Sequence, residues 1–428
     1  MKKTISLLLC FGLLLAMTAC GGGASSPAPP PPARTAPPPR SSAPAGSAAP
    51  AGSAAPAAPA APAAGEKVVK IGVYEPASGD NGAGGKQEVL GIQYANDKMP
   101  TVEIGGEQYK VELVVVDNES SNDKGPTAAQ SLVSAGVSIA LGSYGSGVSI
   151  AASDVFANAG IPVIGVTCTN PQVTEGNKHY FRICFLDPFQ GTVLANFAVD
   201  NFKGKTAYCL AKLGDDYSVG LCHYFQKAFE ALGGKVVSET FPDGNSDFAS
   251  YVTNAKNAKA DVFFSPVSTE AAALIIEQAN AQSLGMPIMA GDTWDSNVIL
   301  AAAKDKKVEV YVTTFYQEGG NPEFDAGIKQ WINSDPTHLS NNGGNDIVSA
   351  VSAMGYDAYF TALEAIKAAG STDPKAVNEA LWTAKYSGVT GEIAFDDVNG
   401  DAIRDVAYVK QADNATGAWK FIAVQGVK

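Results

Sequence analysis

The chain has 428 residues, of which 46% are hydrophobic and 17% charged, and its formal net charge at pH 7 is −13. An acidic chain without a cluster of lysines and arginines is a poor candidate for binding nucleic acid. Its six cysteines include no closely spaced Cys-x-x-Cys pair, which disfavours a zinc site, and we expect no metal and no cofactor.

An apolar run at residues 5–17 follows a short basic start and ends in small residues. The run is too short to cross about 30 Å of hydrocarbon, so it predicts a secretory signal and not a spanning helix. The sequence MTAC, which ends at Cys20, resembles the lipobox of bacterial lipoproteins. That resemblance implies cleavage of the signal peptide 1–19 and a lipid on the Cys20 sulfur. The alternative is a signal cut after residue 19 that leaves a free cysteine.

The segment 20–65 continues from this cysteine and is composed mainly of Gly, Ser, Ala and Pro, with no acidic residue. It has no large apolar side chains to bury, so it predicts a disordered tether with extended character from proline. Such a tether could reach on the order of 100 Å. We therefore expect an extracytoplasmic protein anchored by a lipid to a bacterial membrane, either in the periplasm or at the cell surface.

The folded region begins near residue 66, and its length of about 360 residues suggests two domains. Apolar, β-branched runs alternate along it with segments of helical spacing, which predicts parallel strands with helices on both faces. The fold class is therefore α/β, with two doubly wound parallel sheets. The expected strands include 67–76, 109–120, 137–147, 161–166, 205–213, 235–241, 260–267 and 287–291.

Ligands of such sheets bind beyond the carboxyl ends of the strands, so the turns at those ends are the candidate sites. Ser78 follows the first strand, and it is equally well explained as part of a polar turn. Ser146 lies in the sequence GSYGSG, where capping of the next helix is the alternative role. The sequence TCTNP contains Thr167 and Thr169. Hydroxyls and free backbone N–H groups in neighbouring turns predict a cradle for a carboxylate.

Two strand ends in the second half carry the opposite chemistry. Tyr217 follows one strand, and Asp292 follows another in the sequence AGDTWDS. A carboxylate and a phenol opposite a set of donors would hold an ammonium group, so the pattern fits an amino-acid zwitterion. The alternative for Asp292 is to cap the helix that follows it.

From about residue 67 to the end, the chain resembles the extracytoplasmic solute-binding proteins of ABC importers, in particular the type I leucine/isoleucine/valine-binding kind. The resemblance rests on segments such as GSYGSGVSIAASDVFANAGIPVIGVTCTNPQVT, YFRICFLDPFQG, DDYSVGL, PIMAGDTWDS and MGYDAYFTALEAIKAAGS. It implies two lobes that close on a ligand about three crossing segments, near 185–191, 313–315 and 389–393. Lobe 1 is expected to comprise 66–187 and 315–388, and lobe 2 to comprise 188–314 and 389–428.

The resemblance also implies roles for individual residues. Three hydroxyl side chains and one backbone segment would hold the ligand carboxylate, two residues would lie on the ammonium side, and two tyrosines would form pocket walls. The residues that would hold the carboxylate are Ser146, Thr167 and Thr169, with the backbone of Cys168. Those on the ammonium side are Tyr217 and Asp292. The pocket walls would be Tyr74 and Tyr356. Phe189 stands where branched-chain binders carry an acidic residue, which hints at an apolar or aromatic neighbour for the ligand.

We therefore expect a monomeric, lipid-anchored binding protein that captures a branched-chain or other apolar amino acid and delivers it to an ABC importer permease. A ligand-sensing receptor subunit of the same fold, or a binder of a related amide or carboxylate, is the alternative. Enzyme activity is disfavoured because the histidines lack metal spacing and no G-x-S-x-G elbow occurs. The stretch 396–405 lacks key positions of a calcium loop and predicts a hairpin turn. The disulfide state of Cys168, Cys184, Cys209 and Cys222 stays open, with 209–222 the most local pairing.

Overall fold

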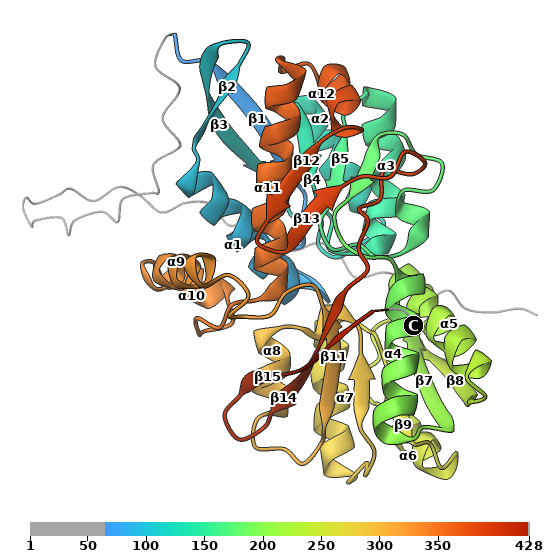
Figure 1. Cartoon of the computed structure of the whole chain (residues 1–428). Helices are drawn as coiled ribbons and strands as arrows, with labels where there is room; N and C mark the ends of the chain where they lie inside the picture. Colours follow the sequence, from blue (N-terminus) through green and yellow to red (C-terminus); the bar gives the residue numbers. More distant parts are fainter. Residues whose placement is uncertain (1–64, 427–428) are drawn as a thin grey trace, which may run out of the picture. The chain divides into compact units, whose positions relative to one another are not determined.

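The computed structural model describes residues 65–426, so the expected signal peptide, the lipidated Cys20 and nearly all of the expected tether lie outside the described residues. The described chain is built from two large sheets, each covered by helices, and a third sheet of only two strands (Figure 1). The α/β class with two parallel-dominated lobes is confirmed. Within the described part of the chain, no helix combines the length and the apolar character needed to cross a membrane.

The first sheet has six strands in the order β2-β3-β1-β4-β5-β6. All neighbours are parallel except β2 and β3, which form an antiparallel hairpin around Gly105 and Gly106. Both glycines have positive φ, a conformation that glycine adopts without strain. The strands are β1 (Val68–Val73), β2 (Thr101–Ile104), β3 (Glu107–Val115), β4 (Ile139–Leu141), β5 (Val163–Gly165) and β6 (Tyr180–Arg182).

The second sheet has seven strands in the order β15-β14-β11-β10-β9-β7-β8. Its five strands from β7 to β11 are parallel, and the last two strands of the chain add to one edge in antiparallel fashion. The strands are β7 (Thr206–Lys212), β8 (Lys235–Phe241), β9 (Val262–Phe264), β10 (Ile288–Ala290), β11 (Val310–Thr314), β14 (Ala407–Asp413) and β15 (Ala418–Gln425).

Helices connect the parallel strands, and their ends carry local stop and start signals. Asp215 and Ser268 accept hydrogen bonds from backbone N–H groups as N-caps, and Gly136 and Gly160 end helices in the left-handed conformation. The longer helices are α1 (Gly82–Lys98), α2 (Gly125–Ala135), α3 (Ser146–Ala159), α4 (Asp187–Phe202), α5 (Asp216–Ala231), α6 (Ala249–Asn257), α7 (Thr269–Ala281), α9 (Pro322–Asn333) and α11 (Ala350–Ala369). The shorter ones are α8 (Asn297–Ala303), α10 (Pro336–Asn341), α12 (Pro374–Leu381), η1 (Pro171–Val173) and η2 (Asp292–Trp294).

Helices α1 and α11 pack together unusually closely. A Cβ atom on Gly91 would lie 1.9 Å from the carbonyl oxygen of Ser352, and one on Gly355 would lie 2.3 Å from that of Glu88. The backbones of the two helices therefore touch where both lack side chains. This contact buries the inner face of α1, including Gln87 and Glu88.

Three segments connect the two lobes. The first runs from β6 into α4, and the second leaves β11 towards α9, which packs with α1 and α11 on the first lobe. The third follows the hairpin of β12 (Lys385–Gly388) and β13 (Gly391–Ala394) and leads into β14 (Figure 1). Ile393 belongs to the first lobe's core, so the third segment starts after residue 394. The β12–β13 hairpin therefore spans the boundary that was expected at residue 388.

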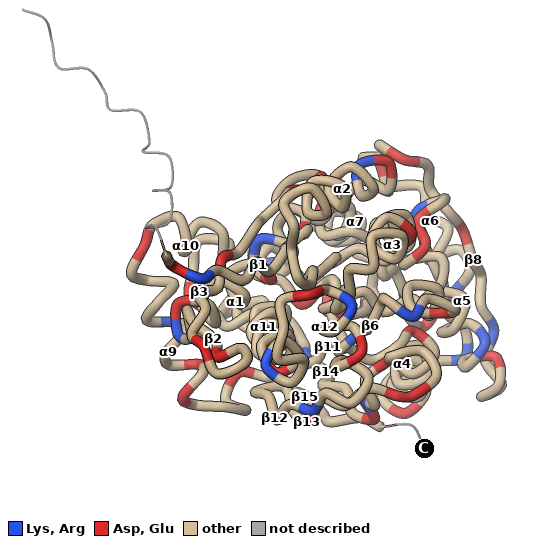
Figure 2. The backbone as a smooth tube through the Cα atoms, turned by 90° about the horizontal axis from the view of Figure 1, so that it is seen from above, with Lys and Arg blue, Asp and Glu red and all other residues tan. Residues whose placement is uncertain are grey.

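Positively and negatively charged positions are interspersed over the described chain, as Figure 2 shows. In the stretch 396–405, the Asp396 Oδ1 atom accepts hydrogen bonds from the N–H groups of Val398 and Asn399 at 2.8 and 2.6 Å. This carboxylate therefore organises a tight turn. Four buried cysteines, at positions 168, 184, 209 and 222, are free thiols.

Candidate binding site between the lobes

The candidate site lies where the carboxyl ends of strands from both sheets meet. On the first lobe, the turn after β5 carries Thr169, whose carbonyl oxygen accepts a hydrogen bond from the N–H of Asp187 at 3.0 Å. Asp187 is the first residue of α4, directly after the first connecting segment. This backbone bond joins the predicted carboxylate cradle to the hinge region.

Asp292 is the centre of the site on the second lobe. Its Oδ1 atom accepts hydrogen bonds from Gln190 Nε2 at 2.9 Å and from the Tyr217 hydroxyl at 3.0 Å. Burial raises the pKa of Asp292 to about 6, although these two hydrogen bonds oppose the shift. Asp292 does not cap the following helix, because Ser296 takes that role for α8. The alternative role of Asp292 as the cap of that helix is therefore wrong.

Three side chains at this junction contain buried atoms without a hydrogen-bond partner among the described residues. These atoms are Thr169 Oγ1, both carboxyl oxygens of Asp187 and Gln190 Oε1, although the Thr169 hydroxyl lies close enough to Asp187 to oppose the rise of its pKa. Burial raises the pKa of Asp187 to about 8. Buried polar groups in native proteins nearly always find partners, so water or a ligand must satisfy these atoms.

A second pair of acids, Glu75 and Glu88, was not anticipated. Glu75 Oε2 accepts a hydrogen bond from the N–H of Tyr144 at 2.6 Å, and Glu88 Oε2 accepts one from the Thr167 hydroxyl at 2.6 Å. Burial raises the pKa of Glu88 to about 7, and burial together with the neighbouring Glu88 raises that of Glu75 well above its usual range. Each carboxyl group therefore holds its proton to a higher pH than a free glutamate does.

Tyr144 connects this acid pair to Asp292. Its hydroxyl donates to the carbonyl oxygen of Thr293, the residue after Asp292, at 3.1 Å, while its backbone N–H binds Glu75. The charge of Asp292 also contributes to the raised pKa of Glu88. The pair and Asp292 thus surround the same region between the lobes. A tyrosine within the glycine-rich sequence GSYGSG was the signal that could have drawn attention to this position.

The predicted cradle residues lie close to this region but differ in their availability. Ser146 is the first residue of α3 and makes no capping bond, while its Oγ atom accepts a hydrogen bond from the N–H of Asn170 at 3.3 Å. The Thr167 hydroxyl is already committed to Glu88, and the Cys168 side chain is buried in the core of the first lobe. The buried Thr169 hydroxyl lies beside the Asp187 carboxyl group, and this contact opposes the rise of the Asp187 pKa.

The buried guanidinium of Arg182 holds this turn in place. Its Nη1 atom donates to the carbonyl oxygens of Cys168 and Asn170 at 3.0 and 2.6 Å, and its Nη2 atom lies 2.7 Å from Asp401 Oδ1. A buried charge of this kind is stable only when its hydrogen bonds and its counter-ion are complete. Arg182 is therefore a structural support of the Thr169 turn.

The structure places four further predicted residues outside the group around Asp292. The Tyr74 ring packs on Phe156, and its hydroxyl bonds to that of Tyr180 in the core. Ser78 is exposed and donates to Asp117 Oδ2 at 2.7 Å. Tyr356 packs on aromatic rings of α1 and α9, and Phe189 packs against Phe185 near the first connecting segment.

Polar contacts close the interface between the lobes at its rim. Lys212 Nζ of the second lobe lies 2.6 Å from Asp80 Oδ2 of the first and 2.7 Å from Asp243 Oδ1 of its own lobe. The Thr269 hydroxyl donates to the carbonyl oxygen of Asp80 at 3.1 Å, and Ser296 Oγ donates to Gln87 Oε1 at 3.1 Å. The structure therefore describes the two lobes in contact.

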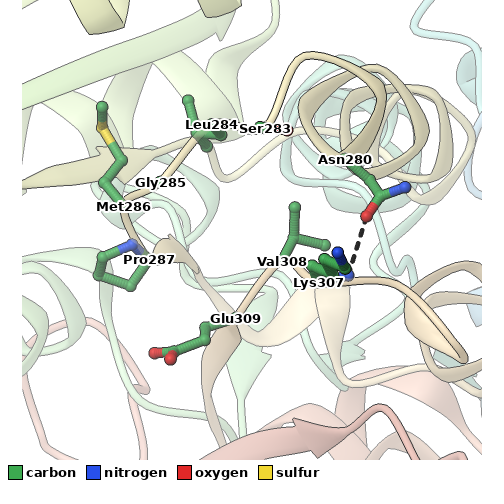
Figure 3. Close-up of a pocket in the computed structure, with 9 residues that line it drawn as sticks. All are labelled: Asn280, Ser283, Leu284, Gly285, Met286, Pro287, Lys307, Val308 and Glu309. Atoms are coloured by element: carbon green, nitrogen blue, oxygen red, sulfur yellow. Dashed lines mark hydrogen bonds between the residues drawn. The ribbon is translucent and has the colours of Figure 1, made fainter.

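A separate pocket of about 290 Å³ opens on the second lobe (Figure 3). It is bordered by residues 283–287 and 307–309, with Asn280 Oδ1 accepting a hydrogen bond from the N–H of Lys307 at 2.8 Å. These residues precede β10 and β11, so the pocket lies at the amino ends of the strands. Ligands of parallel sheets bind at the opposite ends, which separates this pocket from the candidate site.

Two α/β lobes joined by three segments, with unsatisfied polar groups enclosed between them, define a hinged binding protein for a small ligand. The sequence model of the family described as "Periplasmic binding protein" matches residues 68–417. The chain belongs to this family, in its type I, branched-chain amino acid group.

Similar proteins agree with this assignment. The Leu/Ile/Val-binding protein homolog 1 of Brucella melitensis is 30% identical over 362 residues, which cover 83% of this chain and 93% of that protein. The crystal structure of a leucine-binding protein from Thermotoga maritima is similar with a TM-score of 0.73 and 32% identity, covering 84% and 99% of the two chains. A branched-chain amino acid transporter substrate-binding protein from Streptococcus pneumoniae, in complex with isoleucine, gives a TM-score of 0.72 at 25% identity, covering 85% and 100%.

Proposed function

We propose that this protein is a lipid-anchored, monomeric substrate-binding protein that captures an amino acid between its lobes and delivers it to an ABC importer permease. The observation that carries this proposal is the enclosed junction around Asp292. There, one lobe offers the buried Thr169 hydroxyl, and the other offers an acid already oriented by Tyr217. The names of the similar proteins, which bind leucine or isoleucine, support an amino acid as the ligand class.

In this proposal the ligand carboxylate lies against Thr169, Ser146 and the backbone at Cys168. The ligand ammonium lies against Asp292, with Tyr217 and Gln190 fixing the orientation of that carboxyl group. Thr167 acts indirectly, because its hydroxyl holds Glu88. A ligand that contacts both lobes binds the closed arrangement more tightly than the open one, so it shifts the population towards closure. The permease would then recognise the closed form.

The test is a thermal-shift screen of the purified protein against the twenty amino acids, with simple amides and simple carboxylates as comparison sets. A ligand that binds only the folded state raises the melting temperature. We expect at least one amino acid to raise it and the simple carboxylates to leave it unchanged. A stabilising carboxylate without an amine would contradict the role given to Asp292. Lipidation is tested separately, by labelling cells with a radioactive fatty acid and comparing the wild type with Cys20→Ser.

A further inference from the structure

One side chain of the first lobe bonds to the second lobe directly beside the candidate site. The Asn170 Nδ2 atom donates a hydrogen bond to the backbone carbonyl oxygen of Asp216 at 2.8 Å. Asn170 follows Thr169 in the turn after β5, whereas Asp216 is the first residue of α5 in the second lobe. Asn170 is only 6% exposed, so water has little access to this bond. The bond therefore joins the two lobes at the edge of their junction.

Asn170 is also held firmly within the first lobe. Its Oδ1 atom accepts a hydrogen bond from the N–H of Gln172 at 2.9 Å and caps η1, while its own N–H donates to Ser146 Oγ at 3.3 Å. Its carbonyl oxygen accepts a hydrogen bond from Arg182 Nη1 at 2.6 Å. Because the residue is fixed at these points, the turn that carries Thr169 and the bond to the second lobe move together.

The other partner of this bond belongs to the helix that positions Tyr217. Tyr217 follows Asp216 in the first turn of α5, and its hydroxyl donates to Asp292 Oδ1 at 3.0 Å. A displacement of this first turn would displace the phenol that orients Asp292. The Asn170 bond therefore connects the proposed carboxylate side of the site to its proposed ammonium side.

Two glycines, one on each lobe, leave the space that this contact needs. A Cβ atom on Gly220 of α5 would lie 2.8 Å from Asn170 Nδ2, and one on Gly147 of α3 would lie 2.8 Å from Asp216 Oδ2. Both glycines lie within helices, where alanine is the more favourable residue, so helix formation does not call for glycine at either position. The close approach of the opposite lobe explains both.

We propose that Asn170 is a positioning residue for closure, which joins the Thr169 turn to the first turn of α5 when the lobes close on the ligand. This inference rests on the proposed function and names a contact that holds its closed state. The bond to Asp216 is made only when the lobes meet, so it stabilises the closed arrangement without touching the ligand. It therefore slows release of the ligand and leaves the rate of association unchanged.

The experiment compares the wild type with Asn170→Asp, Gly220→Ala and the double variant, with L-leucine, L-isoleucine and L-valine as probes. Asn170→Asp keeps the acceptor that caps η1 but removes the donor to Asp216. Gly220→Ala displaces the Asn170 amide from the opposite lobe and favours α5 itself. Calorimetry measures the affinity, and stopped-flow fluorescence measures the two rates. Lys227→Ala, at an exposed position of α5, is the control.

We expect each of the two single variants to raise the Kd about tenfold, through faster dissociation. The melting temperature of ligand-free Gly220→Ala should not fall, because the substitution favours the helix. Both variants break the same contact, so the double variant should bind little more weakly than either single variant. Lys227→Ala should match the wild type.

Each other outcome has a separate meaning. Unchanged dissociation rates in both single variants would overturn the inference and leave the proposed function intact. A lower melting temperature of ligand-free Gly220→Ala, with both rates altered, would assign this contact a structural role only and would also overturn it. If none of the three amino acids binds the wild type, the proposed ligand class fails and the inference fails with it. Gly220→Ala decides the matter even if Asn170→Asp does not fold.

Discussion

The hydroxyl of Tyr217 and the carboxyl group of Asp292 are joined by a 3.0 Å hydrogen bond beneath the junction of the two lobes. Asp292→Asn removes the negative charge but keeps the shape, so we expect amino-acid affinity to fall by about 1.5–3 kcal/mol, the usual worth of a charged hydrogen bond. Tyr217→Phe should cost about 0.5–1.5 kcal/mol, because it removes only one of the bonds that orient the acid. Calorimetry measures both, and equal affinity for Asp292→Asn and wild type would contradict the ammonium role.

Gly291 allows Tyr217 and Gln190 to approach Asp292. A Cβ atom at this position would lie 2.3 Å from the Tyr217 hydroxyl and 3.0 Å from Gln190 Nε2, although φ is an unexceptional −83°. Gly291→Ala should therefore displace both side chains and weaken ligand binding, with overpacking costing about 1–3 kcal/mol. The control is Ala258→Gly at the half-buried end of α6, which should leave ligand affinity unchanged. Unchanged affinity in Gly291→Ala would show that the Tyr217 position is not needed.

The raised pKa values predict how the stability of the ligand-free protein depends on pH. Unfolded carboxyl groups titrate near pH 4, whereas Asp292, Glu88 and Asp187 titrate at about 6, 7 and 8 in the folded protein. Between pH 4 and these raised pKa values, the folded state holds more protons than the unfolded state. The contribution of these groups to stability is therefore complete below about pH 4 and is lost as the pH rises towards 8.

This dependence can be measured by thermal unfolding of the ligand-free protein at pH 5, 6, 7 and 8. We expect the melting temperature to fall more steeply over this range in the wild type than in Glu88→Gln, whose amide does not titrate. If the melting temperatures of the wild type and of Glu88→Gln fall in parallel, Glu88 keeps the same protonation state over this pH range.

Lys212 bridges the lobes at their rim through Asp80. Lys212→Met should weaken ligand binding by about 0.2–1 kcal/mol, the usual range for a partly exposed ion pair, because it removes a contact made only in the closed state. Lys306→Met is the matched control, since Lys306 pairs with Glu277 within one lobe. The difference between the two variants should shrink at high salt. Identical ligand affinities of Lys212→Met and Lys306→Met at low salt would show that the Lys212–Asp80 bridge does not contribute to closure.

Arg182 supports the Thr169 turn from beneath. Arg182→Met leaves Asp401 as an uncompensated buried charge and frees two carbonyl oxygens, so we expect a loss of about 3–5 kcal/mol in the free energy of unfolding. Chemical denaturation measures this loss. The double variant with Asp401→Asn should recover part of it, and no recovery would indicate that the carbonyl contacts dominate.

Sequence reasoning predicted the parts of the fold that follow from local rules, and it proposed the candidate site from the same rules. Apolar runs between helical segments predicted the parallel sheets, and the strand-end rule pointed to Thr169, Tyr217 and Asp292. The hairpin partner β2 was missed, because its short alternating pattern of exposed and buried residues carries little signal beside Gly105 and Gly106.

Glu75 and Glu88 were missed for a physical reason. A glutamate within a helix is normally a solvent-exposed residue, and nothing near Glu88 in the sequence indicates burial. Its burial results from the close approach of α1 to α11, which begins more than 250 residues later along the chain. Contacts of this range are set by tertiary packing, so local patterns do not reveal them.

The order of the connections also governs when each lobe can finish folding. The first lobe needs α11 and the β12–β13 hairpin, and the second needs β14 and β15 to complete its sheet. Neither hydrophobic core is complete until the last segments of the chain have emerged during synthesis. An incomplete core delays stable folding, and such a delay suits an extracytoplasmic protein that is exported before it folds.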